Sequence, residues 1–139
     1  MDKTPEYIKQ CEKAKQLRDK WIPHEYDDVY SARSGVHKLS EGVLLMAECV
    51  PFGGINRIRA DFIPLFRQDQ LQEMIEDYKS SLNKVELMCA EVNQFVEKFW
   101  ASHPSWLPDT MEQLWLAFVM SERYSKQWSI DKQEWVEKC

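Results

Sequence analysis

The sequence predicts an α+β fold, in which an N-terminal helix and a set of C-terminal helices pack on a small antiparallel β-sheet. Apolar residues recur at helical spacing near both ends of the chain, whereas residues 26–66 hold short β-leaning runs separated by turn residues. The chain has 139 residues, of which 44% are hydrophobic and 12% aromatic, so it can bury a sizeable core. We therefore expect a single domain over residues 1–139.

The first expected element is a helix within residues 1–23. Thr4 supplies a capping hydroxyl, Pro5 suits the first helical position, and Glu6 places a carboxylate near the positive end of the helix. Six apolar or small residues then follow at helical spacing: Tyr7, Ile8, Cys11, Ala14, Leu17 and Trp21. Pro23 favours an end to the helix just before it.

Residues 26–66 predict the small sheet. The run 43–50 is apolar on both sides apart from Glu48, as a central strand would be. Residues 51–54 form a strong turn signal. After this turn, apolar and charged residues alternate with the two-residue period of a strand that is wet on one side: Arg57, Ile58, Arg59, Ala60, Asp61 and Phe62.

Residues 67–125 predict helices, and residues 126–139 a short hairpin or tail. Asp69 begins a helical stretch that continues to Tyr78, and Asn83 with Glu86 indicates a second cap after a break. Asp109 is the expected cap of the last helix. That helix is apolar over most of its circumference, so we expect it to be the most buried.

Two dense blocks carry a resemblance to known sequences. They are FIPLFRQDQLQEM at 62–74 and MEQLWLAFVMSERYSKQW at 111–128, and YIKQCEKA at 7–14 adds to them. With these blocks the chain resembles a group of small proteins encoded in phages and prophages of Gram-positive bacteria, although FIPLF replaces the Trp-Leu-Pro lead-in of that group. The resemblance implies a phage origin and a shared fold, and it brings no catalytic residue.

Charge and cysteine usage narrow the function classes. The net charge is −5, and residues 68–139 hold seven basic and thirteen acidic side chains, which is the wrong sign for a general nucleic-acid coat. An acidic surface suits a basic partner or simple solubility. No apolar run approaches the roughly 20 residues that span a bilayer, and the N-terminus lacks a signal-peptide pattern. Four widely spaced cysteines without a C-x-x-C pair suggest reduced thiols, so we expect a cytoplasmic protein. The resemblance to phage proteins implies that this cytoplasm is that of a bacterial host cell.

No pattern for catalysis or metal binding stands out. His24, Glu25, Asp27 and Asp28 offer enough ligand types for a cation, but adjacent acids diverge in an extended segment, so a solvated acidic turn is the favoured interpretation. No histidine accompanies a G-x-S-x-G motif, and the Gly pair at 53–54 lacks the rest of a phosphate loop. We expect no enzyme activity, no cofactor and no metal.

One candidate site could bind an anion. Arg57 and Arg59 lie on the same side of the expected strand, with Arg67 a few residues later, and two guanidinium groups about 7 Å apart could hold a phosphate or contact nucleic acid. The alternative is that they form only the wet face of the sheet.

A second candidate site could bind a protein. Trp100 and Trp106 flank a proline-containing loop where rings are difficult to bury, and tryptophan is favoured at binding hot spots. Glu73, Glu76 and Asp77 belong to a row of seven carboxylates over residues 69–97, which could imitate a DNA backbone or simply be solvated. We expect non-enzymatic binding to a host or phage protein; the alternative is binding of nucleic acid or a small phosphate ligand through the arginines.

Overall fold

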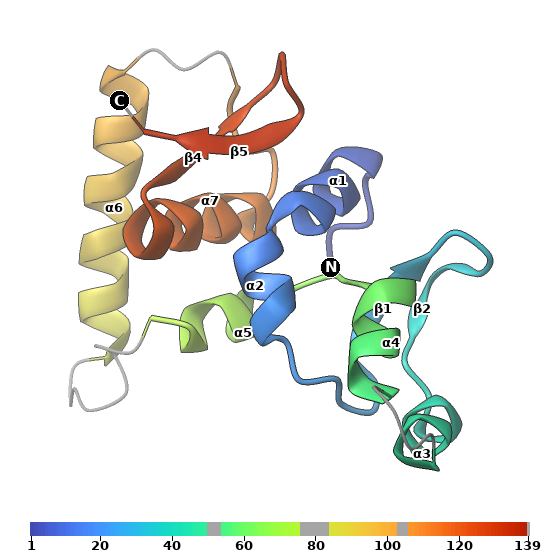
Figure 1. Cartoon of the computed structure of the whole chain (residues 1–139). Helices are drawn as coiled ribbons and strands as arrows, with labels where there is room; N and C mark the ends of the chain where they lie inside the picture. The colour runs from blue at the N-terminus through green and yellow to red at the C-terminus, as the bar shows by residue number, and fades with distance from the viewer. Residues whose placement is uncertain (50–53, 76–83, 103–105, 139) are drawn as a thin grey trace. The chain divides into compact units, whose positions relative to one another are not determined.

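The computed structural model describes residues 1–49, 54–75, 84–102 and 106–138 (Figure 1). Helices and two small antiparallel sheets make up its ordered elements, which confirms the α+β class. The chain divides into two compact units, Met1–Phe66 and Arg67–Cys139, called here the N-terminal and C-terminal units. The expectation of a single domain stays a prediction, since two compact units are compatible with one domain or with two.

The N-terminal unit begins with two short helices instead of one. Helix α1 spans Pro5–Lys13 and is capped by the Thr4 hydroxyl, as expected, while α2 spans Lys15–Lys20. Ala14 separates them because its ψ of 63° departs from helical geometry, and its N–H bonds to the carbonyls of both Gln10 and Cys11. Ala14 is fully buried, so the break occurs inside the core, where no sequence signal marks it.

A three-stranded sheet follows, with the order β2-β1-β3 and antiparallel pairing throughout. Its strands are β1 (Asp28–Ser31), β2 (Gly35–Lys38) and β3 (Ile63–Pro64). The register pairs Ser31 with Gly35, which leaves a three-residue hairpin loop. Gly35 has a φ of +68°, a conformation that glycine adopts without steric cost and that such hairpins favour.

Two expected strands are wrong, because both segments are helical. Helix α3 spans Glu41–Cys49 and α4 spans Gly54–Asp61. A short apolar run does not distinguish strand from helix, and the first segment is rich in Leu, Met, Ala and Glu, which are strong helix formers. Of the alternating residues 57–61 in α4, only Ile58 is buried. The alternation therefore does not correspond to the buried face of a strand, and a helix with one buried position accounts for it.

The C-terminal unit is built around α7 (Met111–Tyr124), most of whose residues are buried, as expected of the last helix. The Thr110 hydroxyl caps it by accepting the Gln113 N–H at 3.2 Å, so the expected cap at Asp109 is wrong by one residue. Helix α5 (Gln68–Glu73) packs against α7 and ends before the predicted Tyr78. Helix α6 spans Lys84–Ala101, and the expected cap at Asn83 lies outside the described residues.

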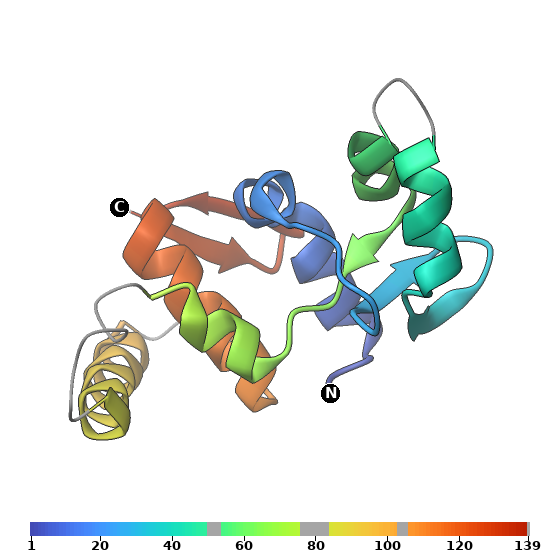
Figure 2. The same ribbon diagram turned by 90° about the horizontal axis from the view of Figure 1, so that it is seen from below.

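The predicted C-terminal hairpin is confirmed. Strands β4 (Lys126–Ser129) and β5 (Glu134–Glu137) pair antiparallel, and β4 packs beside α7 in both ribbon views (Figures 1 and 2). Trp128 and Trp135 face each other across the pair, with ring centroids 5.2 Å apart in an edge-on arrangement. The Lys138 N–H donates to the Ser125 carbonyl at 2.9 Å and ties the end of β5 to the end of α7.

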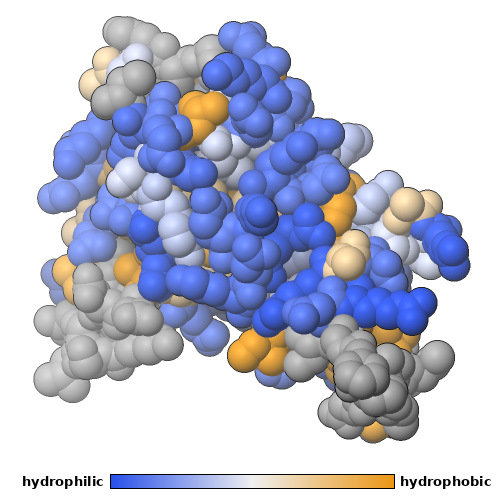
Figure 3. Space-filling view, viewed as in Figure 1, coloured by the Kyte–Doolittle hydropathy of each residue, from blue (hydrophilic) through white to orange (hydrophobic). Residues whose placement is uncertain are grey.

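On the face of the molecule seen in Figure 3, hydrophilic side chains dominate, and hydrophobic ones form small separate patches. Among the described helices, none combines the length and the apolar character that a bilayer crossing requires.

Candidate functional site

A groove of about 1010 Å³ lies in the C-terminal unit, lined by α6, α7, β4 and the segment after α5. Helix α6 contributes residues that lie three or four positions apart and so share one face of the helix: Glu91, Gln94, Phe95, Lys98 and Phe99. Ser102, which follows directly after the end of the helix, also lines the groove. This size reaches the upper end of the range of small-ligand clefts, roughly 300–1,000 Å³. We call it the aromatic–basic groove, after its floor and its rim.

Aromatic rings form the floor of the aromatic–basic groove. Phe95 of α6 lies 5.3 Å from Phe118 of α7, and Phe99 lies 6.1 Å edge-on from Trp106, measured between ring centroids. Phe118 and Trp106 are buried, whereas Phe95 and Phe99 are only half-buried. The α6 side of the floor therefore keeps apolar surface that is in contact with water.

Two buried indoles of the floor have no hydrogen-bond acceptor within the described part of the chain. The Nε1 atoms of Trp106 and Trp128 are both enclosed by neighbouring atoms. A buried N–H without an acceptor costs about 1–3 kcal/mol. Because neighbouring atoms shield these two nitrogens from water, they are not available to donate a hydrogen bond to a ligand in the groove.

Basic side chains form the rim. Among the lining residues that the structure describes, Lys98, Arg123, Lys126 and Lys138 are basic, and Glu91 and Glu122 are acidic. The C-terminal unit as a whole is acidic, since residues 67–139 contain eight basic and thirteen acidic side chains. The described part of the groove lining is therefore more basic than the unit to which it belongs.

Hydrogen bonds hold two of the rim cations in place. The Lys138 ammonium donates to the Ser121 hydroxyl at 2.7 Å, and the Arg123 guanidinium donates to the Met74 carbonyl. The neutral hydroxyl fixes the Lys138 side chain without cancelling its charge. By contrast, Lys126 lies 3.8 Å from the exposed carboxylate of Glu137, at the long end of ion-pair distances.

The two tryptophans expected to form a protein interface are not brought together. Trp100 is 59% exposed, as an interface residue would be, but helical periodicity puts it on the opposite side of α6 from the groove. Trp106 is 5% exposed and lines the groove floor, so the expectation that its ring would be difficult to bury is wrong. Phe99 provides the aromatic contact that covers it. As interface residues, both remain predictions.

The expected acidic surface is described only in part. Glu73 is exposed at the end of α5. Glu76 and Asp77 lie outside the described residues, so their role as a protein interface or a DNA mimic remains a prediction.

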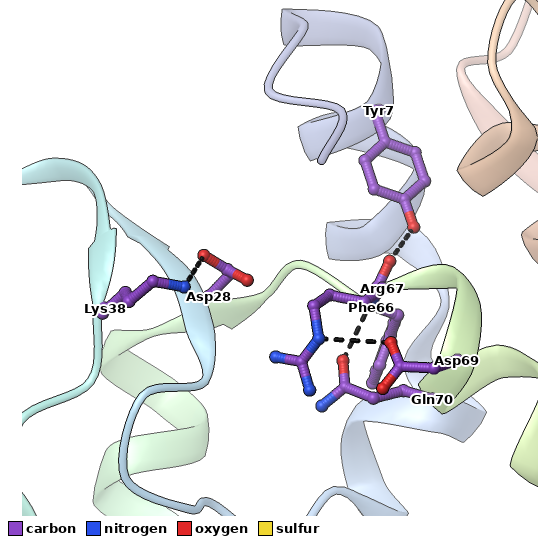
Figure 4. A network of polar contacts seen from close by, with 7 residues as sticks. All are labelled: Tyr7, Asp28, Lys38, Phe66, Arg67, Asp69 and Gln70. Carbon is purple, nitrogen blue, oxygen red and sulfur yellow. Dashed lines mark hydrogen bonds and ion pairs between the residues drawn. The ribbon is translucent and has the colours of Figure 1, made fainter.

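The expected arginine strand does not exist, because Arg57 and Arg59 belong to helix α4. Arg57 is exposed and lies 3.8 Å from Asp61, one helical turn away. Arg59 instead donates from Nε to the Trp21 carbonyl at 2.7 Å, so it is used within the fold. Arg67, in the other unit, contacts the Asp69 carboxylate at 3.2 Å (Figure 4). The spacing of about 7 Å that a strand would give is therefore wrong, and anion binding by these residues remains a prediction.

The acidic turn after α2 is structural rather than solvated. Asp27 is 5% exposed and accepts the Trp21 indole N–H at 3.1 Å and the His24 backbone N–H at 2.9 Å. Asp28 is 6% exposed and bonds to the Lys38 ammonium at 3.0 Å (Figure 4). The two carboxylates thus have separate partners, and among the described residues no group of three or more potential ligands is placed to hold a metal ion.

A buried thiol lies in the core of the N-terminal unit. Burial raises the pKa of Cys11 to about 12, although hydrogen bonds with the Phe66 backbone and the Tyr7 side chain act in the opposite direction. The Tyr7 hydroxyl also donates to the Phe66 carbonyl (Figure 4), which joins α1 to the segment after β3. This cluster is therefore a packed core, and its thiol is kept in the protonated form.

Sequence reasoning missed the groove. One signal was available: the stripe on α6 mixes Phe95 and Phe99 with Lys98 and Glu91, whereas a stripe that packs only into a core is apolar. The contribution from β4 could not be found this way, because it depends on how the hairpin packs on α7.

Comparison with protein-family models, with curated proteins and with solved structures finds no match to this chain.

Proposed function

We propose that this chain is a non-enzymatic protein that binds another protein through the aromatic–basic groove. The observation that carries the proposal is the half-buried pair Phe95 and Phe99, left in contact with water beside a charged rim. Apolar surface rimmed by polar groups is typical of protein interaction sites, because a partner removes it from water. Burying a fully exposed aromatic ring contributes about 1.5–3 kcal/mol, so covering each of these half-buried rings would contribute part of that free energy.

The Ser121–Lys138 pair in the groove also supports binding over catalysis. The two side chains are hydrogen-bonded, and a serine–lysine pair can serve a hydrolase when the lysine is buried. Lys138 is exposed to water, so it suits a binding rim better than a general base.

The setting follows from the resemblance to phage and prophage proteins. It supports a host protein as the partner, including a defence factor whose activity the chain would modulate, and therefore a site of action in the cytoplasm of the bacterial host. The acidic balance of the C-terminal unit supports a protein partner over nucleic acid, since phosphate backbones require clustered cations over a long surface.

Site-specific photo-crosslinking in host lysate tests this proposal. Gln94 and Gln127 are exposed and line the groove, so each is replaced in turn by a photoreactive amino acid. Asn93 is the matched control, because it is exposed on α6 outside the groove stripe. We expect both groove positions to crosslink to the same host protein and the control position not to do so.

The captured protein is then purified and measured against the wild-type chain and Phe95→Ala. We expect at least a tenfold loss of affinity for the variant, about 1.4 kcal/mol, with its folding checked by thermal unfolding. Identical adducts at all three positions, or an unchanged affinity of a folded Phe95→Ala, would rule out the groove as the contact surface.

A further inference from the structure

We infer that the aromatic–basic groove takes an acidic, amphipathic peptide segment of its partner, an inference that rests on the proposed function. The segment would place large apolar side chains on the floor and carboxylates against the rim. Laying an amphipathic helix into a groove is a recurrent mode of peptide recognition, with anchors three and four residues apart.

The charge of the rim selects an acidic segment. Three lysines, Lys98, Lys126 and Lys138, are among the described lining residues, although the unit as a whole carries more acids than bases. Lys98 is exposed and has no hydrogen bond or ion pair within the described residues, and the ammonium of Lys138 has only a neutral hydroxyl. Carboxylates would therefore gain contacts here that no neighbouring side chain already makes.

The rim takes its cations from more than one element, which favours a segment that carries several acids. Lys98 belongs to α6, while Lys126 belongs to β4, and the aromatic floor includes residues of both α6 and α7. A ligand that covers Phe95 and Phe99 would thus have cations available from more than one element. A small anion would pair with the basic side chains of the rim but leave the aromatic rings of the floor in contact with water. A purely apolar ligand would cover the rings but leave the basic side chains without an acid.

Synthetic peptides test this inference with the full-length chain. The probe is a fluorescein-labelled peptide of about 15 residues with Leu and Trp at helical spacing and Glu on both flanks. One comparison peptide has Lys in place of Glu, and another has Ser in place of Leu and Trp. Fluorescence anisotropy should show saturable binding of the acidic amphipathic peptide alone, weakened by added salt because exposed charges are screened over about 8 Å at physiological ionic strength.

Two charge reversals locate the binding. We expect Lys98→Glu to weaken the acidic peptide at least fivefold, and Lys132→Glu, the same change on the exposed hairpin loop, to weaken it by less than twofold. Equal effects of the two variants would overturn the inference, as would equal binding of the lysine peptide.

The outcomes separate this inference from the proposed function. If no peptide binds but the groove positions still crosslink to one host protein, only the acidic segment is wrong. If neither peptides nor a host protein engage the groove, both proposals fail. A concentration-dependent dimer that Lys98→Glu dissociates would also overturn the inference, since the occupant would then be a second copy of the chain.

Discussion

The two units use their polar side chains in opposite ways. In the N-terminal unit, the buried carboxylate of Asp28 bonds to the Lys38 ammonium at 3.0 Å, and Asp27 accepts the Trp21 indole N–H. In the C-terminal unit, Lys98 has no partner within the described residues and Lys138 has a neutral one. The difference teaches that a carboxylate buried in the fold has its partners inside the protein, while these two exposed lysines of the groove rim are not neutralised by a neighbouring acid.

The largest contrast between the units should be seen in their thiols. Cys11 is fully buried with a pKa of about 12, against 9.0 for an ordinary cysteine, whereas Cys89 is exposed on α6. With Cys49 and Cys139 replaced by Ser, alkylation at pH 8 should modify Cys11 at least about a thousandfold more slowly than Cys89, because only the thiolate reacts. Mass spectrometry of quenched samples measures both rates, and similar rates would show that the Cys11 core opens readily.

The same thiol makes stability depend on pH. Because the folded pKa of Cys11 lies above the unfolded value, its contribution is complete below pH 9 and is lost as pH rises toward 12. The free energy of unfolding should fall by up to about 1.4 kcal/mol per pH unit in that window. Urea titrations at several pH values measure this slope, and Cys11→Ala should remove that part of it. An identical slope in the variant would assign the effect to other groups.

The next largest effect should come from removing the Asp27 carboxylate, which accepts hydrogen bonds inside the N-terminal unit. Asp27→Ala leaves the buried Trp21 indole N–H and the His24 N–H without their partner, so we expect a loss of about 2–3 kcal/mol in the free energy of unfolding. Asp27→Asn keeps one acceptor oxygen and should cost about half as much. Lys98→Ala, in the groove rim, should change stability by less than about 0.5 kcal/mol. If Lys98→Ala lowered the free energy of unfolding as much as Asp27→Ala does, Lys98 would also be a structural residue, and the contrast between the two units would be wrong.

The smallest expected effect is the difference in the free energy of unfolding between substitutions of two arginines in helix α4. Arg59→Ala removes the hydrogen bond to the Trp21 carbonyl and should cost about 1–2 kcal/mol, while Arg57→Ala, on the exposed side of α4, should stay within about 0.5 kcal/mol. Denaturant unfolding measures both variants. Oligonucleotide binding is measured in parallel: binding by the wild type that Arg57→Glu abolishes would favour the alternative function, binding of nucleic acid or a phosphate ligand.

The sequence predicted those elements whose signals are local. The Thr4 cap with Pro5, the apolar circumference of α7 and the C-terminal hairpin all depend on residues a few positions apart. The segments α3 and α4 were assigned to strands because short apolar runs and alternating residues fit either structure. What decides between them is packing: among the residues of α4 whose burial is described, Ile58 is the buried one, and its burial depends on neighbours distant in sequence.

The candidate site was less predictable for the same reason. Trp106 and Trp100 are close in sequence and share a residue type, yet one is buried and the other exposed, because only Trp106 meets the ring of Phe99. The groove requires α6, α7 and β4 together, and no spacing along the chain encodes that meeting.

The facing rings of Trp128 and Trp135 have a practical consequence. Two indoles held edge-on at 5.2 Å couple their electronic transitions, so circular dichroism should carry an exciton signal from the β4–β5 hairpin. The N-terminal unit contains a single tryptophan, Trp21, and no such pair. The chain therefore carries a built-in optical reporter for one half of the molecule, and melting of the C-terminal unit can be followed without a label.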